Sequence, residues 1–133
     1  MSVARAQWTS DELRLIGDTD ELEIASRRAD GSLRRYITIW VVRAGDGIYV
    51  RSAHGWENGW FQRALHSGSG RIRVPGVEHD AAFELVDDGD IETASVTQAY
   101  HAKYARYGAS IVGTVVSDEA GRTTLRVLPL DPA

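Results

Sequence analysis

Hydrophobic and polar residues alternate along much of the first half of the chain, which is typical of short β-strands with one buried face. In residues 21–28, Leu22 and Ile24 alternate with Glu23 and Arg27. Residues 33–43 are rich in β-branched and aromatic side chains, and the middle of this segment is apolar at successive positions. Because apolar residues on both faces are typical of a strand inside a sheet, we expect a central strand here.

Glycine-containing turns separate the predicted strands and favour hairpins. The Asp30-Gly31 pair follows the first strand, and Gly45-Asp46-Gly47 follows the second. Both combinations are typical of tight hairpin turns. The remaining strands are predicted at residues 48–53, 71–74, 77–86, 111–117 and 123–128, the last two forming a closing hairpin.

Three segments show helical signals. Thr9 and Glu12 fit a capping box at the start of a short helix that ends near Gly17. A second helix is predicted over residues 60–67, and a third, longer one over residues 90–107. The third helix is expected to begin at Asp90 and to present one face formed by Val96, Tyr100, Lys103 and Tyr107, with Tyr104 beside them.

About seven strands and three helices, joined mostly by hairpins, define the expected fold class. The helices do not alternate with the strands, so a doubly wound parallel sheet is not expected. The pattern predicts a mainly β, α+β protein: a small antiparallel barrel with helices packed at its ends. We expect residues 1–133 to form a single domain.

The amino-acid composition indicates the cellular compartment of the protein and the chemistry it lacks. The chain contains no cysteine, which excludes disulfides and thiol chemistry and is typical of a cytoplasmic protein. No apolar run approaches the roughly 20 residues of a membrane helix, and the N-terminus lacks the apolar stretch of a signal peptide. We therefore expect no membrane partner.

Charge is distributed unevenly along the sequence. The net charge is -4, yet residues 27–73 contain nine arginines against three acids. This asymmetry favours a small anionic ligand held locally, because a nucleic-acid-binding domain is more often basic throughout. We therefore expect no nucleic-acid partner. Lys103 is the only lysine; the preference for arginine suits bidentate phosphate recognition, although genome composition is an equally simple explanation.

Residues 48–65 contain the strongest candidate for a ligand site. A strand runs into a polar, glycine-rich loop and then into a helix, whose first N–H groups can hold an anion. The donors in this stretch are Arg51, Ser52, Asn58 and Arg63, and the flat apolar surfaces are Trp56 and Trp60. We interpret it as a grip for a phosphate-bearing planar ligand; the alternative is arginines that are simply solvated on strand faces.

Metal and hydrolase chemistry lack comparable support. The four histidines, at positions 54, 66, 79 and 101, show no metal-ligand spacing, so no metal site is expected. The chain has no Gly-x-Ser-x-Gly motif and no glycine-rich phosphate loop.

The order of these segments resembles the deazaflavin-dependent nitroreductase-like branch of the flavin-binding split β-barrels, relatives of pyridoxamine phosphate oxidase. The counterparts here are ADGSLRRYITIW, VVRAGDGIYV, RSAHGWENG and the Trp60-Phe61 helix start. Within that clan the chain is most similar to a set of small uncharacterised bacterial proteins. The likeness covers about residues 9–129, but Gly59 stands where the family usually has proline, and Gln62-Arg63 and Ser67-Gly68-Ser69 also differ.

The resemblance implies a homodimeric split barrel that binds deazaflavin (F420) or FMN. By position, Arg51, Ser52, Asn58 and Trp60 match the phosphate-gripping loop, and Arg35 and Thr38 match the strand that contacts the cofactor.

These observations leave two main hypotheses for function. In the first, the protein is an oxidoreductase whose cofactor contacts Arg51, Ser52, Asn58 and Arg63 and whose small acceptor lies beside Trp56 and Tyr107. In the second, the same barrel sequesters a small aromatic or phosphorylated, cofactor-like ligand without redox chemistry, which leaves open that it holds no cofactor at all. A third reading makes the Trp56 loop and the strand with Arg71 and Arg73 a surface for a partner or a second copy.

Overall fold

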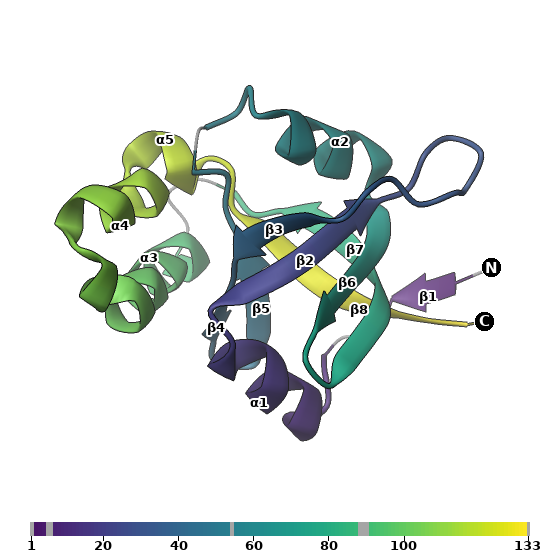
Figure 1. Cartoon of the computed structure of the whole chain (residues 1–133), viewed down its shortest axis with the longest axis horizontal. Helices are drawn as coiled ribbons and strands as arrows, with labels where there is room; N and C mark the ends of the chain where they lie inside the picture. The colour runs from purple at the N-terminus through teal and green to yellow at the C-terminus, as the bar shows by residue number, and fades with distance from the viewer. Residues whose placement is uncertain (1, 5–6, 54, 88–90, 133) are drawn as a thin grey trace.

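The protein folds around one antiparallel β-sheet that curls into a half-barrel (Figure 1). The computed structural model describes residues 2–4, 7–53, 55–87 and 91–132. Seven strands follow the order β3-β2-β6-β7-β8-β5-β4, and β1 pairs with β8 outside this path. The strands are β1 Ser2–Ala4, β2 Glu21–Ser26, β3 Ile37–Trp40, β4 Val42–Ala44, β5 Gly47–Val50, β6 Ser69–Val74, β7 Val77–Leu85 and β8 Leu125–Pro132.

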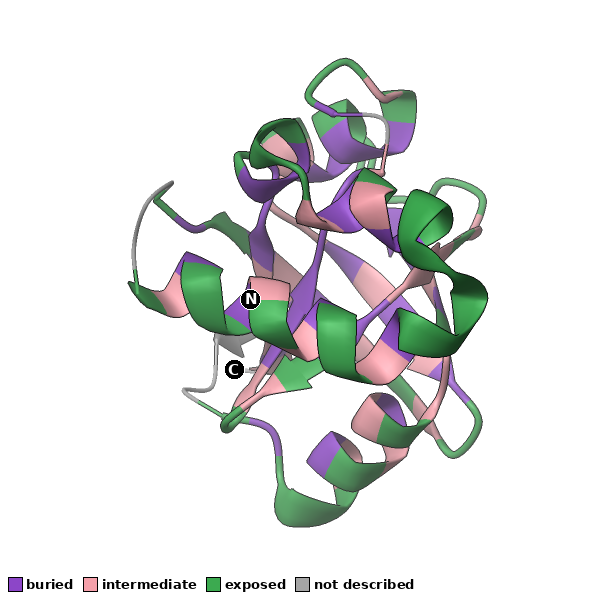
Figure 2. Ribbon diagram, turned by 90° about the vertical axis from the view of Figure 1, so that its left-hand side faces the viewer, coloured by how far each residue is buried: buried purple, intermediate pink, exposed green. Residues whose placement is uncertain are grey.

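Helices cover the half-barrel on several sides. They are α1 Ser10–Asp18, α2 Gly59–Ser67, α3 Ile91–Tyr104, the 3-10 helix η1 Ala105–Tyr107, α4 Ala109–Val116 and α5 Asp118–Gly121. Figure 2 shows exposed residues on the outer surfaces of the helices and buried residues where helices meet strands. No helix of the described segments is long and apolar enough to cross a lipid bilayer.

The buried side chains form two hydrophobic clusters. The larger one fills the half-barrel beneath α1 and α2 and includes Leu22, Ile72 and Phe61. The smaller one joins β4 and β5 to α3 and α4, and its members include Tyr100 and Tyr104, both fully buried. The two clusters place α2 over one end of the barrel and the α3–α4 pair beside it.

Several predicted elements are confirmed. The capping box of α1 forms, since the Thr9 hydroxyl accepts from the Glu12 N–H and the Glu12 side chain accepts from the Thr9 N–H. Helix α2 ends at Gly68, whose φ of 73° suits glycine. The mainly β, antiparallel, α+β class is also confirmed, with both early hairpins in place.

The predicted closing hairpin is wrong. Residues 111–116 lie in α4 rather than in a strand and Ser117 caps the end of this helix, while β8 pairs with β5 and β7 instead. The segment is rich in β-branched residues, which suggested a strand. Val112 and Val115 are three residues apart and bury one helical face against the smaller cluster, so packing overrides the local propensity.

The predicted central strand at residues 33–43 is also wrong. It divides into β3 and β4, which lie at opposite ends of the sheet path and are separated by the buried residue Val41. The chain bends at Val41, so residues of β3 contact the larger cluster while Val42 contacts the smaller one. This division explains why the segment is apolar on both faces without being central.

The predicted third helix is confirmed in outline but is divided. It covers α3 and η1, and its expected cap, Asp90, lies outside the described residues. Val96, Tyr100 and Tyr104 are buried, as expected of its inner face, whereas Tyr107 is 41% exposed.

Candidate functional site

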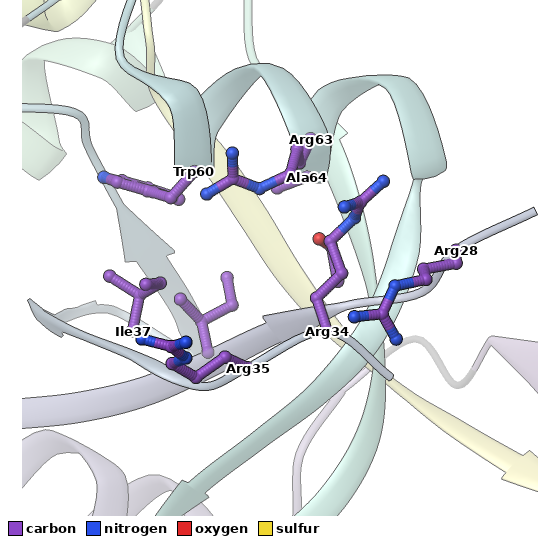
Figure 3. A pocket seen from close by; sticks show the side chains of 9 residues that line it. Arg28, Arg34, Arg35, Ile37, Trp60, Arg63 and Ala64 are labelled. Atoms are coloured by element: carbon purple, nitrogen blue, oxygen red, sulfur yellow. The ribbon is translucent and has the colours of Figure 1, made fainter. Parts of the chain in front are cut away.

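A basic cavity lies between α2 and the segment that joins β2 to β3. Its volume is about 280 Å³, and four arginines line it: Arg28, Arg34, Arg35 and Arg63. We call it the arginine pocket. Figure 3 shows Arg63 and Trp60 on α2, with Arg34 and Arg35 on the segment across from them.

The arginine pocket carries more positive than negative charge. Among the described residues no aspartate or glutamate lines it, although Asp30 of the neighbouring turn interacts electrostatically with Arg28. Arg28 donates to the Ser32 hydroxyl and to the Leu33 carbonyl, both neutral acceptors. Within the described segments, the side chains of Arg34, Arg35 and Arg63 form neither a hydrogen bond nor an ion pair. Three guanidinium groups without a partner in the described segments, with Arg28 beside them, favour an anionic occupant of this cavity.

The hairpin turn between β2 and β3 brings Arg28, Arg34 and Arg35 together. Gly31 has a φ of 87°, and Asp30 accepts from the Ser32 N–H at 2.9 Å and from its hydroxyl at 2.6 Å. These bonds lower the pKa of Asp30. The Arg34 N–H also donates to the Ser26 carbonyl at 2.9 Å, which closes the two arms of the hairpin. These bonds fix the backbone of the hairpin from which Arg28, Arg34 and Arg35 project.

The basic surface continues past the pocket along the hairpin. A wider groove of about 810 Å³ shares Arg28, Arg34 and Arg63 with it and adds Arg27 and His66. Arg27 differs from the others, because it pairs with Asp80 at 3.0 Å. Within the part of the chain that the structure describes, no acidic side chain lines this groove.

An apolar cavity adjoins the arginine pocket on its other side. Its volume is about 420 Å³, and Ile37 and Trp60 line both cavities. We call it the apolar slot. Its other lining residues are Glu21, Thr38, Ile39, Trp40, Arg51, Ala53, Asn58, Ile111, Thr114 and Val115.

Trp40 forms a wall of the apolar slot whose position depends on α3. Its ring stacks on that of Tyr104 with 3.9 Å between centroids and an interplanar angle of 6°. The Tyr107 ring lies 5.2 Å from Trp40 on the outer side. The slot thus has one wall from the sheet and another from Trp60 of α2.

Arg51 lines the apolar slot, but much of its guanidinium is already engaged inside the protein. It is only 2% exposed, and it donates to the Thr124 hydroxyl at 2.8 Å and to the Val115 and Thr93 carbonyls at 2.9 Å each. Ser52 is fully buried, and its hydroxyl donates to the Gly55 carbonyl. Arg51 therefore links α3 and α4 to the segment before β8, and Ser52 organises the loop before α2.

The other predicted site residues are divided between the cavities and their surroundings. Asn58 and Thr38 line the apolar slot, and the Asn58 side chain makes no capping bond to α2. Trp56 is 42% exposed and contacts Phe61 edge-on at 5.1 Å, outside the residues that line the two cavities. Tyr107 also lies outside them, and its hydroxyl donates to Asp20. The structure therefore brings Arg35, Trp60 and Arg63 together, and joins Thr38, Arg51 and Asn58 to the neighbouring slot.

Sequence reasoning missed several lining residues. Arg28 and Arg34 belong to two Arg-Arg pairs on either side of the hairpin turn, and that symmetry was the available signal. Ile111 and Val115 were missed because their segment was expected to be a strand. Among the described residues no cluster of metal-ligating side chains is present, and His54 lies outside them.

The fold and the cavities define a half-barrel protein with a basic pocket next to an apolar slot. The chain belongs to the bacterial family DUF2255, described as an uncharacterized protein conserved in bacteria, whose model matches residues 12–127. No curated protein matches the sequence.

Solved structures share the fold at low sequence identity. A conserved hypothetical protein of Mycobacterium tuberculosis, Rv2991, is 9% identical with a TM-score of 0.56, over 95% of this chain and 83% of that one. HutZ, the heme storage protein of Vibrio cholerae, is 17% identical with a TM-score of 0.54, over 92% of this chain and 87% of its own. At these identities the likeness concerns the fold.

Proposed function

We propose that the protein binds a planar, anionic cofactor, either deazaflavin or FMN, and acts as an oxidoreductase on a small organic acceptor. The observation that carries this proposal is the arginine pocket: four arginines line it and no acidic side chain of the described residues does, and it is joined to an apolar slot through Ile37 and Trp60. A molecule with a phosphate and a flat ring can occupy both cavities at once.

The residues present fit such a group. Guanidinium groups bind phosphate through paired N–H donors, and Arg34, Arg35 and Arg63 have no competing partner within the described segments. Trp60 and the aliphatic side chains of the slot offer apolar surface to a ring. Bound flavins and deazaflavins supply hydride transfer, so the protein contributes binding, orientation and exclusion of water. In this proposal Arg51 and Asn58 contact the cofactor from the apolar slot, and Ser52 acts from the loop beside the slot.

The second candidate is a binding protein without redox activity. HutZ, which shares the fold, is described as a heme storage protein. Heme is also planar and carries carboxylates, so the same basic pocket and apolar slot suit a ligand of that shape. The departures at Gly59 and Gln62-Arg63 favour this alternative.

A homodimer completes the proposal. Ile111 lines the apolar slot and is 51% exposed, so the open side of the slot carries apolar surface that a second copy can cover. Light scattering of the purified protein is expected to give twice the 14.6 kDa chain mass. A monomer at all concentrations would contradict this part. If Trp56→Ala abolishes the dimer without changing ligand affinity, Trp56 is an interface residue instead of a substrate contact.

We place the protein in the cytoplasm, since it has no cysteine.

Ligand titrations followed by absorbance and fluorescence distinguish the two candidate functions. FMN, deazaflavin and heme are each added to the purified protein, and the bound complexes are assayed for reduction of nitro and quinone acceptors. We expect FMN or deazaflavin to bind at micromolar concentration and to support turnover. Binding of heme alone would favour the storage alternative, and no binding of any of the three at tens of micromolar would contradict both.

A further inference from the structure

The half-barrel has a seam where its two end strands follow each other in sequence. β3 ends at Trp40 and β4 begins at Val42, yet these strands lie at opposite ends of the sheet path. No strand-to-strand ladder joins β3 to β4 among the described pairings. The seam, which we define as Trp40, Val41 and Val42, is therefore closed by contacts from outside the sheet.

Side chains at the end of α3 provide those contacts. The Lys103 ammonium donates to the Val41 carbonyl at 2.7 Å and to the Thr19 carbonyl, in the turn before β2, at 2.5 Å. The Tyr104 hydroxyl accepts from the Val41 N–H at 3.0 Å and lies 2.8 Å from the Val41 carbonyl and 2.6 Å from that of Asp20. Together these two residues tie Val41 to the α1–β2 turn.

The same contacts fix the position of Trp40, which forms a wall of the apolar slot. Trp40 precedes Val41 and stacks on the Tyr104 ring, so movement of the end of α3 moves Trp40 as well. In addition, the Asp20 carboxylate accepts a hydrogen bond from the Tyr107 hydroxyl at 2.7 Å and pairs with Arg106. We propose that Lys103 is a positioning residue that closes the barrel seam and thereby sets the Trp40 wall of the apolar slot.

The burial of Lys103 at the end of α3 makes this closure sensitive to the protonation of its amine. The groups facing Lys103 are Asp18 at the end of α1, Asp20 in the turn, and Arg106 of η1, while Arg14 and Arg43 line the same cavity of about 330 Å³. Burial lowers the pKa of Lys103 from 10.5 to about 8, and the two aspartates oppose that shift. An opening that exposes the amine to water restores its ordinary pKa, so the open form binds the proton more tightly.

The direction in which pH shifts the opening equilibrium follows from the difference between the pKa of Lys103 in the closed form and in the open form. Below about pH 8 the amine is protonated in both forms, and the opening equilibrium does not depend on its titration. Between about 8 and 10.5 the open form keeps a proton that the closed form has lost. Rising pH in this range therefore favours the closed seam.

Hydrogen exchange of the Val41 amide tests this without any ligand. After correction for the intrinsic exchange rate, we expect its protection in the wild-type protein to be constant from pH 6.5 to 7.5. It then rises by up to about tenfold per pH unit between pH 8.5 and 9.5. In Lys103→Met the rise is expected to disappear, and in the matched control His101→Met, an exposed position on the same helix, it is expected to remain. A flat wild-type profile overturns the proposal.

Ligand binding gives a second readout, which rests on the proposed function. Lys103→Met and Tyr104→Phe are expected to weaken FMN binding by about tenfold, because the ring loses its wall. Binding of inorganic phosphate by the arginine pocket is expected to stay unchanged. Equal loss for both ligands, or no loss for either, overturns the positioning role. If wild-type protein binds no FMN, the proposed function fails for that cofactor, while the Val41 exchange still decides the role of Lys103.

Discussion

Replacing Arg51 with alanine is expected to lower the free energy of unfolding by about 3–5 kcal/mol. The guanidinium is almost fully buried and links the end of β5 to Thr93 of α3, Val115 of α4 and Thr124 before β8. Its removal leaves two carbonyls and a hydroxyl without this donor in the interior, and each such loss costs about 1–3 kcal/mol. Urea denaturation monitored by tryptophan fluorescence measures the change.

Arg51→Lys is the matched variant for that experiment. A lysine keeps the charge but cannot reproduce the planar, three-directional set of donors, so we expect an intermediate loss of stability. If Arg51→Ala unfolds within 1 kcal/mol of the wild type, the residue is not the structural link described here.

Removing two arginines from the arginine pocket is expected to have the largest effect on binding. In the double variant Arg34→Ala/Arg63→Ala, affinity for the phosphate-bearing cofactor is predicted to fall by about a hundredfold or more. Each charge-assisted hydrogen bond contributes about 1.5–3 kcal/mol, and 1.4 kcal/mol corresponds to a factor of ten. Neither side chain has a partner in the described segments, so little change in stability is expected.

The control for this prediction is an exposed arginine elsewhere. Arg14 lies on α1, 3.8 Å from Asp11, and Arg14→Ala is expected to leave cofactor affinity unchanged. Isothermal titration calorimetry at two salt concentrations separates specific loss from general electrostatics, because the wild-type protein should show the steeper salt dependence. A similar loss in Arg14→Ala would mean that overall charge, not this pocket, determines binding.

Local patterns in the sequence predicted the elements whose signals are short-range. The capping box of Thr9 and Glu12, the glycine turn at residues 45–47 and the stop at Gly68 depend on neighbours in sequence, and each appears in the structure. The antiparallel class followed from the same hairpins.

The failures concern features that depend on distant contacts. A run of β-branched residues at 111–117 forms a helix because Val112 and Val115 find a partner surface on α3 and β4. The apolar segment at 33–43 bends at Val41 because Lys103 and Tyr104, more than sixty residues later, bind that backbone.

In the candidate site, too, the sequence predicted some features, whereas those that depend on distant contacts were missed. Arg35, Trp60 and Arg63 were predicted from the sequence and line one cavity. Arg51 was predicted as a phosphate ligand from the donor-rich stretch at residues 48–65 and from the family resemblance, but its bonds to Thr93, Val115 and Thr124 depend on how the helices fold over it. Its contact with a bound cofactor stays a prediction.

The central claim is that the arginine pocket and the apolar slot form one binding site, which a single NMR titration can test. With ¹⁵N-labelled protein, the Trp60 indole N–H reports on the boundary of the slot, and the Arg34 and Arg63 Nε–H groups report on the pocket. We predict that all three signals shift on addition of FMN or deazaflavin and follow one saturation curve with one dissociation constant. Shifts of the arginines without Trp60, or of Trp60 without the arginines, would contradict the account.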